Sequence, residues 1–357
     1  MPSDVRPPDG GPGTLGELGE FGLIARVAAR LGAPPPPVGP GDDAAVVAAP
    51  DGALLATTDL LVEGVHFRTD WSTGHDVGCK AAAQNLADVT AMGGRPAALL
   101  VGLVAPAATP VAWLDGLADG LRDEAARGGC PVVGGDTVAG PVLMVSVTAL
   151  GHPGPRPVLR SGARPGDAVV LLGSLGTSAA GLALLAGGVP AGLDAGIAAR
   201  LLAAHRRPRP DYAAGPLLAA AGATALCDVS DGLVGDLGHL ARAGGVAVVL
   251  DGMAALADAP WLADVAAAAH ALGGGAAAAA QLVAAWVLAG GEEHSLVGAV
   301  PPAALPVVVA AGGRVLGRVA AATSSPGAPG VTVGPTALWS AADAAAAVRR
   351  PGWDHFA

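Results

Sequence analysis

Hydrophobic and polar positions along the first half of the chain predict both helices and strands. Apolar residues at helical spacing predict helices at residues 21–31 and 113–126, and a stretch poor in β-branched residues predicts another at residues 75–92. Short aliphatic runs predict strands at residues 44–49, 53–58, 60–65, 98–104, 131–133 and 142–150. The first half is therefore predicted to mix the two kinds of element.

The second half alternates strand-like and helix-like segments. Strands are predicted at residues 168–172, 246–250 and 307–310, and helices at residues 178–186 and 232–242. Between the halves, residues 156–167 are rich in proline, glycine and arginine, which is typical of a connection. We therefore predict an α/β fold of mixed α+β order with two domains. Their expected bounds are 20–155 and 156–357, after a disordered tail at residues 1–19.

Composition and charge argue against several classes of function. Apolar residues make up 52% of the chain and charged residues 14%, which permits a sizeable core and disfavours wholesale disorder. The net charge of −10, without any run of basic residues, disfavours a nucleic-acid partner and favours sites that bind cations. The three cysteines fit neither a disulfide framework nor zinc-ligand spacing, and they predict a cytoplasmic protein.

No segment predicts secretion or insertion into a membrane. Residues 1–13 lack the basic and apolar regions of a secretory signal. Residues 265–291 carry no charged side chain and are long enough to span a bilayer, but they contain three consecutive glycines and many alanines. Because alanine supplies little transfer free energy, we expect no membrane partner.

Seven aspartates, most of them where a predicted element meets glycine, are candidates for a metal site. They are Asp42 and Asp43 in GPGDDAA, Asp59 in TTDLLVEGVHF, Asp88 in NLADVTAMGG, Asp136 in GGDT, and Asp228 and Asp231 in CDVSDG. Any single one of these aspartates could have the structural role of stabilising the turn in which it lies, since aspartate accepts hydrogen bonds from nearby backbone N–H groups. As a set they favour a Mg²⁺ site, because glycine permits sharp turns and close approach of a ligand.

Other signals for phosphate chemistry are weaker. The chain has no GxxxxGK[ST] phosphate-binding loop, and the nearest stretch, GSLGTSAAG at residues 173–181, lacks a lysine. We predict that this stretch is a plain turn from strand to helix. His66 follows Asp59 closely enough to share its site, although a lone histidine can equally be structural.

Taken together, the motifs resemble those of thiamine-monophosphate kinases. In chain order they are GEFGLI, GDDAAV, TTDLLVEGVHF, NLADVTAMGG, GGDT, RSGARPGD, CDVSDGLVGDLGHL, GGEE and WDHF. Several are shared with a superfamily that resembles aminoimidazole ribonucleotide synthetase, but VEGVHF, NLADVTAMG, SDGL and WDHF in combination point to the kinase. The resemblance extends from Glu20 to Phe356.

The resemblance implies a fold and a reaction. The fold would have an N-terminal α/β domain that pairs in a homodimer and a C-terminal α/β domain, with ATP bound without a Walker loop. The reaction would be phosphorylation of thiamine monophosphate to thiamine diphosphate by ATP and Mg²⁺. Direct in-line transfer needs positioning and charge neutralisation rather than a covalent intermediate.

The resemblance also assigns roles to individual residues. Mg²⁺ would be held by Asp43, Thr57, Thr58, Asp59, Asp88, Asp136, Asp228 and Asp231. ATP would contact Gly135, Asp136, Arg160 and Ser230, and catalysis would involve Asp43, Asp136 and Arg160. His66, Glu292 and Trp353 would face the substrate, where an acid and an aromatic ring suit the thiazolium and pyrimidine rings.

One departure and two alternatives accompany the resemblance. Residues 290–296 read GGEEHSL where the family usually has a segment like GGEDYEL, so His294 and Ser295 replace an aromatic residue and an acid. Selenophosphate synthetase and the hydrogenase-maturation protein are alternatives, but the chain lacks an early cysteine and a terminal one. A non-catalytic nucleotide or thiamine-phosphate binder is disfavoured because clustered acids that bind no ion repel one another.

Overall fold

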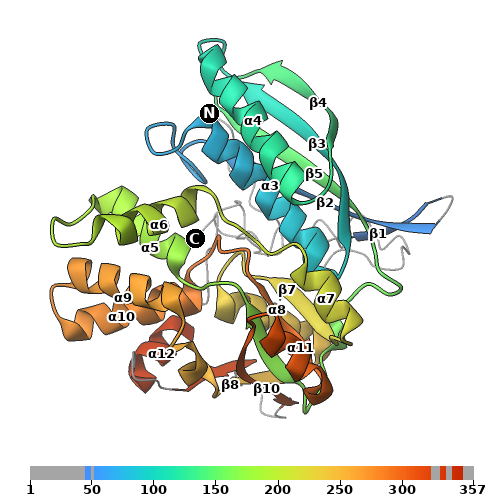
Figure 1. Cartoon of the computed structure of the whole chain (residues 1–357), viewed down its shortest axis with the longest axis vertical. Helices are drawn as coiled ribbons and strands as arrows, with labels where there is room; N and C mark the ends of the chain where they lie inside the picture. Colours follow the sequence, from blue (N-terminus) through green and yellow to red (C-terminus); the bar gives the residue numbers. More distant parts are fainter. Residues whose placement is uncertain (1–44, 50–51, 323–329, 335–339, 349–357) are drawn as a thin grey trace, which may run out of the picture.

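The computed structural model describes residues 45–49, 52–322, 330–334 and 340–348. Two β-sheets with helices packed against them form this part of the chain (Figure 1). The first sheet has the strand order β1-β2-β5-β3-β4, and the second has the order β11-β8-β10-β6-β9-β7. The mixed α/β fold predicted from the sequence is confirmed.

The first sheet carries two helices on one face. Its strands are β1 (Ala45–Ala49), β2 (Gly52–Val62), β3 (Arg95–Ala105), β4 (Val132–Ala139) and β5 (Met144–His152), and its helices are α3 (Gly74–Ala91) and α4 (Val111–Arg127). Strand β5 pairs antiparallel with β2 and β3, whereas β4 runs parallel to β3 at the edge. Leucines, valines and alanines of the sheet and of both helices share one core.

Helices α3 and α4 lie close together because glycine occupies their contact. A Cβ atom at Gly74 would lie 1.9 Å from the carbonyl oxygen of Trp113, and one at Gly120 would lie 2.2 Å from that of His75. Thr73 and Asp76 begin α3 with a reciprocal capping box. Helix α3 is buried along almost its whole length, since the second half of the chain covers its remaining side.

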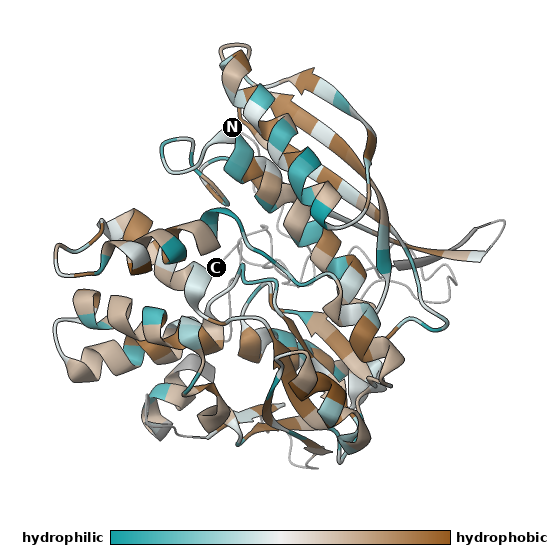
Figure 2. Cartoon of the chain, viewed as in Figure 1, coloured by the Kyte–Doolittle hydropathy of each residue, from teal (hydrophilic) through white to brown (hydrophobic). Residues whose placement is uncertain are grey.

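The opposite face of the first sheet and its edge strand β4 are apolar and exposed. Leu60, Leu100, Val133 and Val138 are each at least 40% exposed, and every residue of β4 is exposed. Figure 2 shows the hydrophobic colouring of these strands. An apolar surface of this extent is typical of a contact with another molecule.

The second sheet is covered by helices on both faces. Its strands are β6 (Ala168–Leu172), β7 (Ala225–Asp228), β8 (Val246–Leu250), β9 (Leu296–Val300), β10 (Arg314–Ala321) and β11 (Val331–Val333). Its helices are α5 (Thr177–Gly187), α6 (Ala195–Arg206), α7 (Ala214–Ala220), α8 (Leu233–Gly244), α9 (Pro260–Gly273), α10 (Ala276–Ala289), α11 (Leu305–Ala310) and α12 (Ala341–Val348). Short 3-10 helices occupy Arg160–Gly162, Met253–Leu256 and Pro302–Ala304.

Strand β6 shows how the second sheet packs on two sides. Val169 and Leu171 belong to one buried cluster, and the alternate residues Val170 and Leu172 belong to another. Every residue of β7 and β9 is buried. This explains why these strands read as continuous apolar runs rather than as alternating patterns.

Most elements predicted from the sequence are present. The predicted helices at residues 75–92, 113–126, 178–186 and 232–242 are α3, α4, α5 and α8, and the predicted strands at residues 168–172 and 246–250 are β6 and β8. The helix predicted at residues 21–31 and the tail at residues 1–19 lie outside the described residues. The domain bounds at residues 155 and 156 stay a prediction.

Two predictions of secondary structure were wrong. Residues 53–58 and 60–65 were expected to form separate strands, but β2 continues through Asp59, whose backbone pairs with Val147 of β5. Residues 307–310 were expected to form a strand because they are β-branched. They lie in helix α11, where a proline in the first turn favours helical geometry.

The charge-free segment at residues 265–291 falls within two helices, α9 and α10. Gly274 and Gly275 join them with positive φ angles of 67° and 156°, which are accessible to glycine. Within the described part of the chain, no helix combines the length and hydropathy needed to cross a bilayer.

Candidate active site

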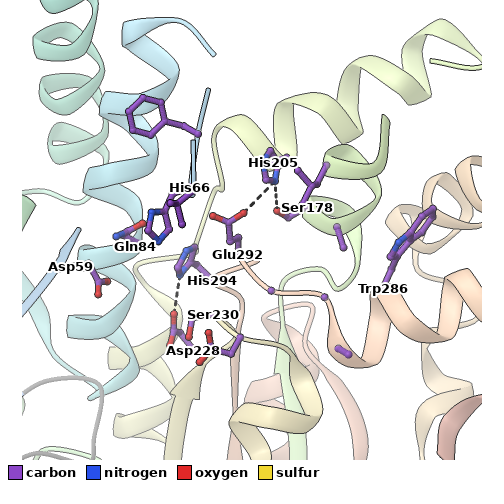
Figure 3. Close-up of a pocket in the computed structure, with 18 of the residues that line it drawn as sticks. Asp59, His66, Gln84, Ser178, His205, Asp228, Ser230, Trp286, Glu292 and His294 are labelled. Atoms are coloured by element: carbon purple, nitrogen blue, oxygen red, sulfur yellow. Dashed lines mark hydrogen bonds and ion pairs between the residues drawn. The ribbon is translucent and has the colours of Figure 1, made fainter. Parts of the chain in front are cut away.

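A cavity of about 920 Å³ lies between the two halves of the chain. Its walls come from β2 and the loop that follows it, from helices α3, α5, α6 and α10, and from the loops at residues 228–231 and 289–294. Figure 3 shows side chains from both halves pointing toward this space. Segments that are distant in the sequence therefore meet at one site.

Strand β2 and helix α3 form the first wall. Thr57 and Asp59 lie on one face of β2 because side chains alternate along a strand. The Thr57 hydroxyl donates a 2.8 Å hydrogen bond to Asp88 Oδ2, and the side chain of Asn85 accepts a 2.9 Å bond from the backbone N–H of Asp59. These contacts fix the two elements relative to each other.

The aspartates at the end of β7 and in the loop after it form a second acidic group. Asp228 is 2% exposed, and its Oδ2 lies 2.9 Å from His294 Nδ1. Behind the loop, Asp236 Oδ2 accepts hydrogen bonds from the backbone N–H groups of Asp231 and Gly232. Burial raises the pKa of Asp236 well above its usual value, and the charges of Asp231 and Asp228 raise it further. Negative charge is therefore concentrated here.

The loop before β9 presents two residues from a left-handed backbone. Glu292 and His294 have φ angles of 59° and 53°, which cost free energy in residues other than glycine. Their backbone N–H groups donate to the carbonyls of Ser230 and Val229 at 2.7 and 2.8 Å. Both side chains line the cavity, and the residue between them points away.

Glu292 belongs to a buried polar network. Its Oε1 lies 2.7 Å from Lys80 Nζ, and its Oε2 lies 3.4 Å from His205 Nδ1. Burial is the largest single influence and works against ionisation of Glu292, but the charges of Lys80, His205 and His294 and the hydrogen bond from Lys80 together outweigh it and lower the pKa of the carboxyl. For His205, burial and the charge of Lys80 lower the pKa to about 4, so this ring is neutral near pH 7.

The pKa of His294 is shifted in the opposite direction to that of His205. Burial disfavours its charged form, but the hydrogen bond to Asp228 and the charges of Asp228, Asp59 and Glu292 raise its pKa overall. An imidazole beside several carboxylates offsets part of their charge. The departure from the family pattern at this position thus changes the electrostatics of the cavity.

The GSLGTSAAG segment is the predicted turn from strand to helix. Its helix N-terminus binds the carboxylate of Glu293, which accepts hydrogen bonds from the Ser178 backbone N–H at 2.7 Å and from the hydroxyls of Thr177 and Ser174 at 2.8 and 3.1 Å. Burial raises the pKa of Glu293, and these hydrogen bonds counteract part of the effect. The N-terminus of α5 is therefore occupied by the protein's own carboxylate.

The other end of the cavity is apolar. Leu182, Ala183 and Ala186 of α5 face it from one side, and Trp286 of α10 faces it from the other. Nothing in the sequence marked these residues, because they lie in alanine-rich stretches of the two helices, beyond the GSLGTSAAG segment. Small side chains on adjacent helices leave room for a flat ring beside Trp286.

The residues predicted for the site divide into three groups. Those that line the cavity are Thr57, Asp59, His66, Asp88, Arg160, Asp228, Ser230, Asp231 and Glu292. Those that do not line it are Thr58, Gly135 and Asp136. Asp43 and Trp353, together with Asp42, lie outside the described residues.

The second group lies on the first sheet away from the cavity. The Thr58 hydroxyl donates to the carbonyl of Val147 at 3.0 Å and accepts from Thr148. Asp136, on the exposed strand β4, shares a row across the sheet with Leu60, so it lies on the same outer face as Thr58. Gly135 packs where a Cβ would lie 1.9 Å from the Val101 carbonyl oxygen.

The composition of the cavity suits a hard cation. Its hydroxyl and carboxylate groups provide oxygen ligands, which Mg²⁺ prefers. Burial is the main cause of the raised pKa of Asp236, and the negative charges of Asp231 and Asp228 add to it; a cation would offset that added part. Among the residues that the structure describes, no three histidine, cysteine, aspartate or glutamate side chains form a compact metal-binding group.

Comparisons with known proteins identify the class to which this fold and site belong. Residues 41–152 match the family model for the N-terminal domain of AIR synthase related proteins, and residues 164–300 match that for the C-terminal domain. The chain thus has the two-domain architecture of that class. Hydrogenase maturation protein HypE, solved with ATP, shares the fold at a TM-score of 0.59 and 19% identity.

More similar relatives define the particular family. The thiamine-monophosphate kinase of Mycobacterium tuberculosis is 48% identical over 73% of this chain and 76% of its own length, and that of Escherichia coli is 40% identical over 63% and 69%. The solved structure of AaThiL complexed with AMPPCP and TMP has a TM-score of 0.76 at 30% identity and covers 96% of this chain and 98% of its own. The chain belongs to the thiamine-monophosphate kinase family, as the motifs predicted.

Proposed function

We propose that the protein transfers the γ-phosphoryl group of ATP to thiamine monophosphate, giving thiamine diphosphate and ADP. The observation that carries this proposal is a cavity in which carboxylates from both domains surround a space with one apolar end. The family relationship and the AaThiL complex with AMPPCP and TMP support the same reaction.

Charge neutralisation is the main requirement of such a reaction. The donor phosphate and the acceptor phosphate are both anionic, so their approach is electrostatically unfavourable. Thr57, Asp59, Asp88, Asp228 and Asp231 would hold Mg²⁺, which neutralises phosphate charge when bound. The resemblance also assigns Asp43, Thr58 and Asp136 to Mg²⁺; these assignments stay predictions, and Thr58 and Asp136 do not line this cavity. Arg160 and Ser230 line the same cavity and would contact ATP.

His66 is suited to bind the acceptor phosphate. Its Nδ1 accepts a 3.0 Å hydrogen bond from the backbone N–H of Val62, so the neutral ring carries its proton on Nε2. That nitrogen is then a donor for a phosphate oxygen in the cavity that His66 lines. Together with Arg160, it would orient the acceptor for in-line attack.

The apolar end is suited to the rings of thiamine monophosphate. Trp286 offers an aromatic face and α5 offers small side chains, which together would hold a pyrimidine or thiazolium ring. Glu292 lies between this end and the aspartates. Trp353 stays a proposed contact, as the sequence suggested.

We also infer that the protein acts as a homodimer in the cytoplasm. The exposed apolar face of the first sheet supports the dimer, because Leu60, Leu100, Val133 and Val138 would gain burial in a symmetric contact. The three cysteines are free and buried, in keeping with a reducing compartment. Light scattering of the protein and of a Val133→Lys variant tests the dimer, since a charge in the contact should yield monomers.

The activity test uses purified protein with ATP, Mg²⁺ and either thiamine monophosphate or free thiamine. We expect thiamine diphosphate from the monophosphate alone, and we expect its loss on chelation or in an Asp43→Asn variant. A folded protein that forms no product would favour a non-catalytic binder or another ATP-using member of the superfamily. Chromatography of the products distinguishes these results.

A further inference from the structure

Lys80 is the only lysine in the chain; the other 19 of its 20 basic residues are arginines. It lies in the middle of α3, and its side chain is 3% exposed. Lysine is rarely buried to this degree, because its ammonium group loses hydration that only close partners can replace. This residue was not among those predicted for the site, and its side chain does not line the cavity.

The partners of Lys80 come from two loops that do line the cavity. Its Nζ lies 2.7 Å from Glu292 Oε1 and donates a 3.0 Å hydrogen bond to the backbone carbonyl of His66. His66 belongs to the first domain and Glu292 to the second, so one ammonium group joins both sides of the cavity. His66 is also held through its ring by the Val62 N–H.

Glu292, the ion-pair partner of Lys80, is itself bonded to the loop at residues 228–231. The Glu292 backbone N–H is bonded to Ser230, beside the two acidic residues of the CDVSDG loop. The left-handed conformation of Glu292 is unfavourable by itself and persists only where surrounding contacts fix it. The ion pair with Lys80 is such a contact, because it holds the carboxylate in a set direction.

The choice of lysine fits the geometry. An ammonium group is compact and donates in three directions, whereas a guanidinium group is planar and larger. A buried point between one carboxylate and one carbonyl suits the compact group. Because every other position with a lysine or an arginine has arginine, the lysine at this position indicates that the site needs the compact ammonium group.

We propose that Lys80 is a positioning residue for the phosphoryl acceptor, acting through Glu292 and His66. The inference rests on the proposed kinase function. Lys80 would keep the two acceptor-facing side chains at fixed separation across the domain boundary, because its ammonium group contacts Glu292 and His66, whereas the proposed ATP contacts are Arg160 and Ser230.

A double-mutant cycle tests this role. We expect Lys80→Met to raise the KM for thiamine monophosphate at least about tenfold and to change the KM for ATP less than about twofold. In a Glu292→Gln background, the same substitution should lower kcat/KM less than about threefold, because its partner is already altered. Arg122→Met removes an exposed positive charge from neighbouring α4 and should leave both KM values unchanged.

Because the lysine is unique, a second measurement needs no substitution. Protein labelled with ε-¹⁵N-lysine should give one side-chain ammonium signal, which should shift on addition of thiamine monophosphate and much less on addition of a non-hydrolysable ATP analogue. This measurement on the wild-type protein tests the proposed role of Lys80 even if Lys80→Met fails to fold.

Three results would overturn the role of Lys80: an unchanged KM for thiamine monophosphate in folded Lys80→Met, additive effects in the cycle, or an ammonium signal insensitive to saturating thiamine monophosphate. Wild-type protein that makes no thiamine diphosphate would instead refute the kinase assignment. The two failures are therefore distinguishable.

Discussion

The two ends of the cavity differ in chemistry and in origin. The polar end gathers carboxylates from β2, α3, the end of β7 and the loop after it, whereas the apolar end beside Trp286 is lined by α5 and α10. Charge at one end suits the phosphates, and small apolar side chains beside Trp286 suit a ring. The contrast teaches that turnover and recognition of the ring should be separable by substitution.

The largest effect is expected at the polar end, from Asp59→Asn. Removing one negative charge from the proposed Mg²⁺ ligands should lower kcat about 100-fold or more, because the charge of the transferring phosphoryl group is then less well neutralised. Steady-state kinetics at saturating ATP and Mg²⁺ measure this change. The control is Asp115→Asn on the exposed side of α4, which should match the wild type. Equal kcat values for all three proteins would contradict the assignment of chemistry to this end.

A second expected effect concerns the stability of the polar network. Burial lowers the pKa of His205 from its usual 6.5 to about 4 in the folded protein, so below pH 6.5 the unfolded chain takes up a proton that the folded protein does not. The contribution of His205 to stability should therefore fall as the pH falls, by about 2 kcal/mol at pH 5 relative to pH 8. Urea unfolding at the two pH values measures this difference.

The contribution of His205 must be separated from opposite ones. His294 has a raised pKa, so its contribution grows as the pH falls and is lost as the pH rises through that pKa. Comparison of the wild type with His205→Gln isolates the contribution of His205, since the variant should lose about 2 kcal/mol less stability between pH 8 and pH 5. An identical pH dependence in the two proteins would show that His205 is not held neutral by burial.

At the apolar end, Trp286→Ala should act on binding more than on turnover. Loss of an aromatic contact worth about 1 kcal/mol, together with some burial, predicts about a tenfold higher KM for thiamine monophosphate. The kcat should change less than about threefold, because the reacting phosphates lie at the other end. Trp261→Ala on α9 is the matched control, since Trp261 packs on the core without lining the cavity. A fall in kcat without a rise in KM would remove the distinction between the two ends.

The same contrast explains what the sequence could reveal. Aspartates beside glycine were visible as motifs, and Asp59, Asp88, Asp228 and Asp231 do line one cavity. Trp286 and the alanines of α5 carried no such signal, because their role depends on how two helices pack. The left-handed loop at Glu292 was equally hidden, since it is fixed by contacts with a segment some 60 residues away in sequence.

The geometry of a β-strand restricts which residues of a motif can face the same site. The resemblance placed Thr57 and Thr58 on one metal site, yet adjacent side chains of a strand point to opposite faces. Only Thr57 reaches the cavity. Both threonines lie in the strand predicted at residues 53–58, so alternation along that strand would already have separated them, whereas the resemblance assigned them by motif alone.

The smallest expected effect tests this separation directly. Thr57→Val removes the hydroxyl that donates to Asp88, so kcat/KM should fall about fivefold as the carboxylate loses an orienting partner. Thr58→Val removes a hydroxyl that bonds within the sheet, and its effect should be less than about twofold. A larger loss from Thr58→Val would instead place reacting groups on the outer face of the sheet. That face also carries Asp136, and its apolar residues form the proposed dimer contact, so this outcome would make the dimer part of the active site.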